Sequence, residues 1–153
     1  KVYERAFLVS QGLYADSTEE SIKKIYDPGI ALAKTVILED KVILPPQEKT
    51  TAGQVEIISY SANKIVIEAK TNVPQFLVLT DSYYPAWQAT IDGKKTVIYP
   101  ADHALRAIVV PEGQHEIIFE YNSKTFKLGM LTSIISLIIA LIFWKIWKEK
   151  KTN

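Results

Sequence analysis

The side chains best suited to chemistry in this sequence are three aspartates in predicted turns and loops. Asp81, Asp92 and Asp102 carry carboxylates, and two carboxylates at the right separation can hydrolyse a glycosidic bond. Asp92 precedes Gly93, however, and an Asp-Gly pair is typical of a two-residue hairpin turn. A single aspartate in a loop serves more often in a turn or a cap than in catalysis. We therefore predict no catalytic residue in this chain.

A short aromatic segment is the second feature that could do chemistry. Residues 81–87 read DSYYPAW, and exposed aromatic faces could stack against the C–H faces of sugar rings. The alternative is that Trp87 and one tyrosine fill the core, with Pro85 shaping a turn. The candidate glycan-binding residues are Tyr83, Tyr84, Trp87, Tyr99, Asp81 and Arg106.

A cation interrupts one of the predicted strands. Arg106 lies between Leu105 and Ala107, and a charged side chain in a buried strand needs a partner of opposite charge. We predict that Arg106 pairs with a carboxylate such as Asp81 or Asp102, or else points out of the sheet. A structural ion pair is the more common role for such a residue than a contact with substrate.

Composition excludes several classes of protein. The 153 residues include 18 Lys+Arg and 17 Asp+Glu, a balance that argues against a nucleic-acid partner. The chain has no cysteine, so it has neither disulfides nor thiolate metal sites. His103 and His115 are too few for a histidine-rich zinc cluster, and His115, just after a turn, is expected to be exposed. We predict no metal, no cofactor and no nucleic-acid partner.

The elements that must position these residues are mostly strands. From Gln54 onward, apolar and polar residues alternate with period two, and turn signals separate the runs. The run 76–79 is continuously apolar, which is typical of a strand covered on both faces. The predicted strands are 5–14 (ending near Gly12), 35–38, 54–60, 64–70, 76–79, 87–91, 96–99, 105–110 and 115–121.

Strands of this length with regular turn signals indicate a mainly β fold, an antiparallel, jelly-roll-like β-sandwich. We predict one such domain in residues 1–125. Its N-terminal strands and one short helix fall in 1–46, a flexible joint in 47–53 and the main strands in 54–125. The helix should begin near 16–20, where N-cap candidates precede acidic residues.

The C-terminal region is apolar enough to cross a membrane. Residues 128–144 form a 17-residue run without a charge, about 25 Å of helix. The alternative, a buried core helix, would usually show a polar stripe. We predict a transmembrane helix at 126–147 in the lipid bilayer, followed by a basic tail at 148–153. The predicted membrane-interface anchors are Trp144, Lys145, Trp147 and Lys148.

The lysines after the span set the expected orientation. By the positive-inside rule the basic tail lies in the cytoplasm, and the sandwich is therefore extracytoplasmic. The sequence begins Lys1-Val2 without a secretory signal. An exported domain without its own signal leads us to expect earlier membrane spans upstream, in a longer polytopic parent protein with which this chain would be in contact.

Several short motifs resemble one family when they are taken in order. They are residues 5–9 (RAFLV), 81–87 (DSYYPAW), 91–94 (IDGK), 101–107 (ADHALRA), 110–115 (VPEGQH) and 119–121 (FEY). Followed by a membrane span, they resemble the C-terminal region of the YfhO family of bacterial multi-spanning membrane proteins. The chain departs from the family pattern at Ala86 and at Asp102-His103.

The resemblance implies a location in the bacterial cell membrane and a glycosyltransferase of the polytopic GT-C type. Such enzymes use polyprenyl-phosphate sugars and are linked to decorating cell-wall polymers such as teichoic acids. The catalytic carboxylate would then lie upstream of Lys1, and this chain would be an accessory extracytoplasmic domain and membrane anchor. A membrane-tethered carbohydrate-binding module and a purely structural or partner-docking domain remain open as alternatives.

Overall fold

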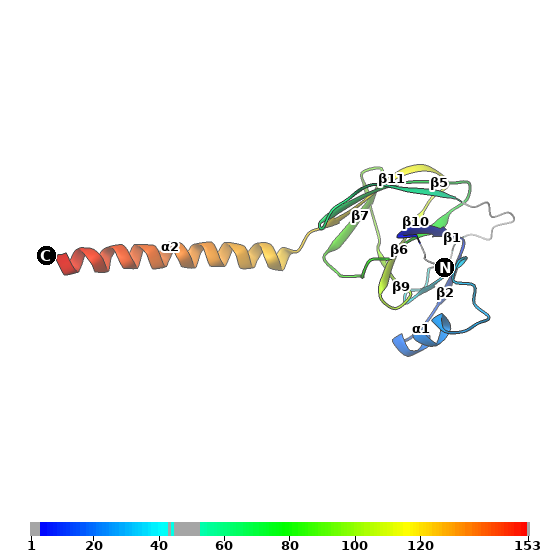
Figure 1. Ribbon diagram of the computed structural model, residues 1–153, viewed down its shortest axis with the longest axis horizontal. Helices are drawn as coiled ribbons and strands as arrows, with labels where there is room; N and C mark the ends of the chain where they lie inside the picture. Colours follow the sequence, from blue (N-terminus) through cyan, green and yellow to red (C-terminus); the bar gives the residue numbers. More distant parts are fainter. Residues whose placement is uncertain (1–3, 43, 45–52, 153) are drawn as a thin grey trace. The chain divides into compact units, whose positions relative to one another are not determined.

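The computed structural model describes residues 4–42, 44 and 53–152, and the chain divides into two compact units, 1–121 and 122–153 (Figure 1). Six strands of the first unit form one sheet: β1 (Ala6–Val9), β2 (Gln11–Tyr14), β3 (Thr35–Leu38), β6 (Gln75–Leu79), β9 (Tyr99–Ala101) and β10 (Leu105–Val110). Five form a second sheet: β4 (Gln54–Tyr60), β5 (Lys64–Thr71), β7 (Trp87–Ile91), β8 (Lys94–Thr96) and β11 (Gly113–Tyr121). The helices are α1 (Thr18–Ile25) and α2 (Lys124–Thr152).

The predicted fold class is confirmed: the first unit is mainly β, with two sheets and a short N-terminal helix. The strand orders are β1-β6-β10-β9-β3-β2 and β4-β5-β11-β7-β8. Figure 1 shows β5 and β11 on one side of this unit, across from β6 and β9. The described pairs of neighbouring strands are antiparallel except β2 with β3. These two are parallel because α1 connects them and returns the chain in the same direction.

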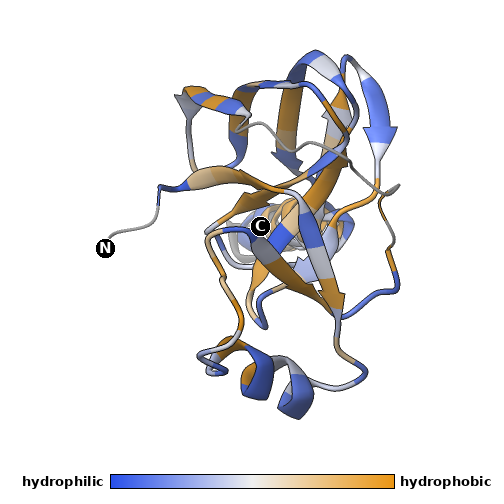
Figure 2. Ribbon diagram, turned by 90° about the vertical axis from the view of Figure 1, so that its right-hand side faces the viewer, coloured by the Kyte–Doolittle hydropathy of each residue, from blue (hydrophilic) through white to orange (hydrophobic). Residues whose placement is uncertain are grey.

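Strand β6 is buried on both faces, as its apolar run predicted. Leu77 and Leu79 face the core between the two sheets, whereas Phe76 and Val78 face a second core on the other side of their sheet. All four side chains are fully buried. Figure 2 shows the interior strands with long hydrophobic segments, whereas α1 has both hydrophilic and hydrophobic parts.

Two predicted strands are wrong in their boundaries. The strand predicted to end near Gly12 breaks at Ser10 instead and continues as β2 to Tyr14, on the other edge of its sheet. Gly12 is not a terminator. A Cβ at this position would lie 2.8 Å from the Phe76 ring, so glycine is what lets β2 pass close to β6.

The strand predicted at 96–99 is two short strands in different sheets. Thr96 ends β8 opposite Ala89, whereas Tyr99 begins β9 opposite Ala107. Between them Ile98 packs against the core between the sheets, and Tyr99 packs against the second core. The chain therefore crosses from one sheet to the other here, which a local apolar pattern does not reveal.

The short helix α1 begins as its sequence predicts. Ser17 is the N-cap, and its hydroxyl accepts a hydrogen bond from the Glu20 amide at 3.2 Å. The Glu20 carboxylate forms an ion pair with Lys24 and accepts a hydrogen bond from the Asp16 amide. These contacts lower the pKa of Glu20 to about 2.

The helix α2 is long and apolar enough to cross a membrane. Its candidate span is Lys124–Lys145, 22 residues with a mean hydropathy of 2.2 and no buried part, or about 33 Å of helix against a hydrocarbon layer of about 30 Å. The hydroxyls of Thr132, Ser133 and Ser136, within its apolar run, donate to helix carbonyls, so they are satisfied without water.

The proposed interface anchors lie at the far end of this span. Trp144 and Trp147 are exposed, and the Lys148 ammonium lies 5.9 Å from the centre of the Trp144 ring. Two sequence expectations fall outside the described part of the chain: residues 47–52 of the joint, and the side chains of the tail beyond Lys148.

Candidate functional site

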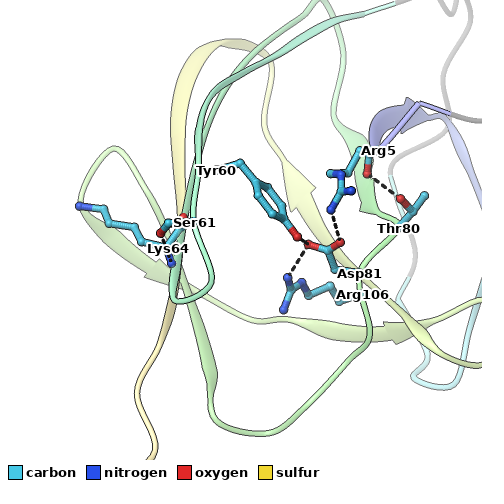
Figure 3. Close-up of polar contacts among 7 residues, drawn as sticks. All are labelled: Arg5, Tyr60, Ser61, Lys64, Thr80, Asp81 and Arg106. Carbon is cyan, nitrogen blue, oxygen red and sulfur yellow. Dashed lines mark hydrogen bonds and ion pairs between the residues drawn. The ribbon is translucent and has the colours of Figure 1, made fainter.

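Asp81 is the centre of a polar network at one end of the sandwich (Figure 3). One carboxylate oxygen accepts from Arg5 Nη1 at 3.1 Å. The other accepts from Arg106 Nη2 at 3.1 Å and from the Tyr60 hydroxyl at 3.0 Å. The predicted pairing of Arg106 with Asp81 is therefore confirmed, and the alternative partner Asp102 is not used.

Strand register brings the two arginines to Asp81. Leu79, near the end of β6, lies between Ala6 of β1 and Arg106 of β10. Arg5 precedes Ala6, and its carbonyl accepts from the Thr80 amide at 2.8 Å. The chain then continues directly to Asp81. Three residues that are far apart in sequence thus lie side by side because β1 and β10 flank the same strand.

Tyr60 reaches the network through a β-bulge. On β4, Val55 and Ile57 face the core, so strict alternation would point Tyr60 outward. The register between β4 and β5 shifts between Ile57 and Ser59, and Tyr60 therefore pairs with the inward-facing Ile65. One extra residue reverses which face each following side chain occupies.

Arg106 is almost completely buried, with an exposed fraction of 1%. Its guanidinium lies 3.9 Å from the centre of the Trp87 ring and 5.4 Å from that of Phe119. Nε and Nη1 have no hydrogen-bond partner within the described part of the chain. Burial lowers the pKa of Arg106, and the charge of Asp81 opposes this shift. The cation is therefore held by one carboxylate and two aromatic rings.

The aromatic residues extend this network towards the surface. The Tyr84 and Tyr121 rings stack with their centres 6.2 Å apart and their planes at 29°. Trp87 meets Tyr121 edge-on at 5.5 Å. Tyr84 remains 57% exposed, whereas Trp87 packs against the core between the sheets. Of Tyr84 and Trp87, only Tyr84 is thus open to a ligand.

The predicted candidates do not all lie together. Tyr84, Trp87, Asp81 and Arg106 share this end of the sandwich. Tyr83 is half-buried and is placed beside it by a hydrogen bond from its amide to the Ala104 carbonyl. Tyr99 lies apart, against the second core.

Four residues around Asp81, Arg106 and Trp87 were not predicted from the sequence: Arg5, Tyr60, Phe119 and Tyr121. Phe119 and Tyr121 could have been found, because they alternate with Glu120 on a predicted strand and so share one face. Arg5 and Tyr60 could not, because a register and a bulge place them there.

The other two aspartates also hold the backbone. Asp102 accepts a hydrogen bond from the Ile37 amide at 2.8 Å, and burial raises its pKa. Asp92 accepts from the Glu116 amide at 3.0 Å and pairs with His115 Nδ1 at 2.7 Å. The Asp92–His115 pair lowers the pKa of Asp92 and raises that of His115.

His115 was expected to be exposed, and this prediction is wrong. Its side chain is only 15% exposed, because the ring lies between Asp92 and the Glu112 carbonyl, which lies 3.2 Å from Nε2. Within the described residues no group of three or more histidine or acidic side chains could hold a metal ion.

Comparison with known proteins places the chain in a family. Residues 47–133, more than half of the chain, match the family described as "Bacterial membrane protein YfhO". This range covers β4 to β11 and the beginning of α2. The chain is also similar to a protein of Bacillus subtilis (strain 168) that is named "Uncharacterized protein YfhO", with 22% identity over 119 residues.

The alignment covers 78% of this chain but only 13% of the Bacillus subtilis protein, so the chain spans a small part of that relative's length. No solved structure matches the chain. The family match, the mainly β unit and the apolar helix agree with one another. The chain belongs to the YfhO family of bacterial membrane proteins.

Proposed function

We propose that this chain is an accessory extracytoplasmic domain and membrane anchor of a polytopic, glycosyltransferase-like protein. The parent would act on cell-envelope glycans or teichoic acids and use a polyprenyl-phosphate sugar as donor. In this proposal α2 crosses the cell membrane, its basic end is cytoplasmic, and the sandwich contacts the upstream transmembrane part of the parent.

One observation carries the accessory role. Each of the three candidate carboxylates is committed to holding the fold: Asp81 accepts from three side chains, Asp92 from an amide and His115, and Asp102 from the Ile37 amide. A general acid or base must instead be free to exchange a proton with substrate. These residues therefore support a domain that positions other parts and leaves the reaction to the parent.

The test uses the full-length parent protein and two modified forms. One form lacks the sandwich but retains α2, and the other carries Lys95→Ala at an exposed position of β8 as a control. Mass spectrometry of the envelope polymers measures the transferred sugar, and immunoblotting of membranes measures protein level. We expect a several-fold loss of glycosylation without the sandwich, at an unchanged membrane level, and no loss with Lys95→Ala.

Two results would overturn the accessory role. The first is sugar transfer by the isolated chain, since the reacting groups would then lie within it. The second is full glycosylation by the parent without the sandwich, provided that the truncated protein reaches the membrane.

A second candidate function is glycan binding by the sandwich itself. The exposed Tyr84 ring, stacked on Tyr121 and close to Trp87, is the observation that favours it. We test this function with Tyr84→Ala and not with a substitution of Trp87. Trp87 packs against Arg106 and the core, so its removal would disturb the fold. Tyr26→Ala, at an aromatic side chain that is 82% exposed elsewhere, is the matched control.

On a glycan array, this second function predicts binding that Tyr84→Ala abolishes and Tyr26→Ala preserves. Both variants should retain the circular dichroism spectrum of the unsubstituted chain. If no glycan binds, or if both variants bind equally well, glycan recognition at this site is refuted.

A further inference from the structure

The exposed apolar side chains of the sandwich are unevenly distributed. One group lies on β2, on α1 or directly after it. The other group lies around the strand ends next to Tyr121, where the chain leaves the sandwich. This second group consists of Ile58, Tyr60, Tyr84 and Val97, each 50–58% exposed. We call the surface that these four residues form with Tyr121 the Tyr121 end.

Strand register places Tyr60, Tyr84 and Val97 near Tyr121, and Ile58 lies two residues before Tyr60 on β4. Tyr121 pairs with Trp87, and its amide donates to the Asn63 carbonyl in the turn that follows Tyr60. Tyr84 stacks on Tyr121. Val97 follows β8, whose last residue, Thr96, pairs with Ala89 close to Trp87.

The opposite end of the same strands differs in character. Its described turns lie at 72–74, 92–93 and 111–112, and none of them carries an exposed large apolar side chain. The Tyr121 end also carries two cations: Lys64, which is exposed and lies opposite the exposed Glu120, and Arg5, which is half-exposed and paired with Asp81. Tyrosines and basic residues around an apolar patch are typical of protein surfaces at lipid headgroups.

The covalent chain limits how far this end can lie from the apolar helix. Asn122 and Ser123 alone separate Tyr121 from Lys124, so the two Cα atoms are within about 11 Å. This limit follows from chain length and holds for any direction of α2. Ser123 caps the N-terminus of α2, since its hydroxyl accepts a hydrogen bond from the Phe126 amide at 3.1 Å.

We propose that the Tyr121 end is a lipid-contacting surface. Tyr60 and Tyr84 lie among the headgroups, Ile58 and Val97 cover the adjoining apolar surface, and Arg5 and Lys64 face lipid phosphates. This proposal rests on α2 crossing the membrane. It assigns the exposed face of Tyr84 to lipid and not to glycan, so the two uses of this side chain can be separated by experiment.

The absence of cysteine in the sequence makes the test simple. Single cysteines replace Ala62, in the turn next to Tyr60, or Glu112, an exposed residue just before β11. The nine residues of β11 separate these two positions by about 30 Å. A third cysteine at Leu137 reports on α2. Each full chain carries a bimane label in phosphatidylcholine–phosphatidylglycerol nanodiscs.

Headgroup spin-labelled lipid should quench the label at Ala62 several-fold more strongly than the label at Glu112. Tyr84→Ser should reduce the quenching at Ala62 and leave that at Glu112 unchanged. Equal quenching at both positions would overturn the proposal, and so would protection of Ala62 from aqueous iodide without quenching by lipid, which would indicate a protein partner. Lipid spin-labelled in its acyl chains should quench Leu137, and its failure to do so would refute the membrane span instead.

Discussion

The buried ion pair between Asp81 and Arg106 predicts an unequal response to removal of its two members. Asp81→Asn removes the negative charge that faces a guanidinium with an exposed fraction of 1%. Arg106→Met removes the buried cation itself and leaves an apolar side chain between Trp87 and Phe119. We expect Asp81→Asn to destabilise the sandwich far more than Arg106→Met.

The magnitudes follow from what each change leaves behind. Asp81→Asn keeps an oxygen that can accept from Arg106 but removes the only described carboxylate paired with this guanidinium, and an uncompensated buried charge costs about 3–5 kcal/mol. After Arg106→Met, Asp81 is still 18% exposed and keeps its bonds from Arg5 and Tyr60. Apolar replacement of a buried charge is often nearly neutral, so we expect a loss of about 1 kcal/mol or less.

Urea unfolding of the chain in detergent micelles measures these differences. All variants carry Trp144→Phe and Trp147→Phe, so that Trp87, which stacks on Arg106, is the only fluorescent tryptophan. The Asp81→Asn/Arg106→Met double variant should be about as stable as Arg106→Met alone, so the coupling energy should equal the cost of Asp81→Asn, about 3–5 kcal/mol. A single Asp81→Asn variant no less stable than Arg106→Met would refute this account of the network.

Three further predictions concern stability. The His115–Asp92 pair should stabilise the fold most between the usual pKa of Asp, 3.8, and that of His, 6.5. This stabilisation is lost as pH rises through the raised His115 pKa or falls through the lowered Asp92 pKa. His115→Gln should remove this pH dependence from urea unfolding measured at several pH values. Ser17→Ala should cost about 1 kcal/mol in urea unfolding through the lost N-cap, and a loss near zero would contradict the cap. Gly12→Ala should cost about 1–3 kcal/mol in the same assay, because its Cβ would meet the buried Phe76 ring; an unchanged stability would show that this close approach is not needed.

The parts of the fold that follow from local pattern could be predicted from the sequence. In β5 the exposed and buried residues alternate along the strand as its side chains indicate. Asp92 and Gly93 both have positive φ, 49° and 76°, as a two-residue hairpin turn requires. The apolar run of β6 predicts burial on both faces because no polar side chain is available for a solvated face.

The parts that depend on register could not be predicted. Ser10 turns one apolar run into two strands on opposite edges of a sheet, and nothing in its side chain signals this. Likewise, the position of Tyr60 depends on the bulge after Ile57, and that of Arg5 on the pairing of β1 with β6. The sequence thus predicts that Arg106 pairs with a carboxylate such as Asp81 or Asp102 or points out of the sheet, but neither which of these is used nor the side chains around the Asp81–Arg106 pair.

The most direct test of the account is a labelling measurement on the membrane-bound protein in intact cells. Single cysteines at Glu112, in the sandwich, and at Lys148, beyond the candidate span, are exposed to a maleimide that cannot cross membranes. If α2 spans the membrane with the sandwich outside, Glu112→Cys is labelled in intact cells and Lys148→Cys only after permeabilisation. Labelling of both in intact cells, or of Lys148→Cys alone, would contradict the account.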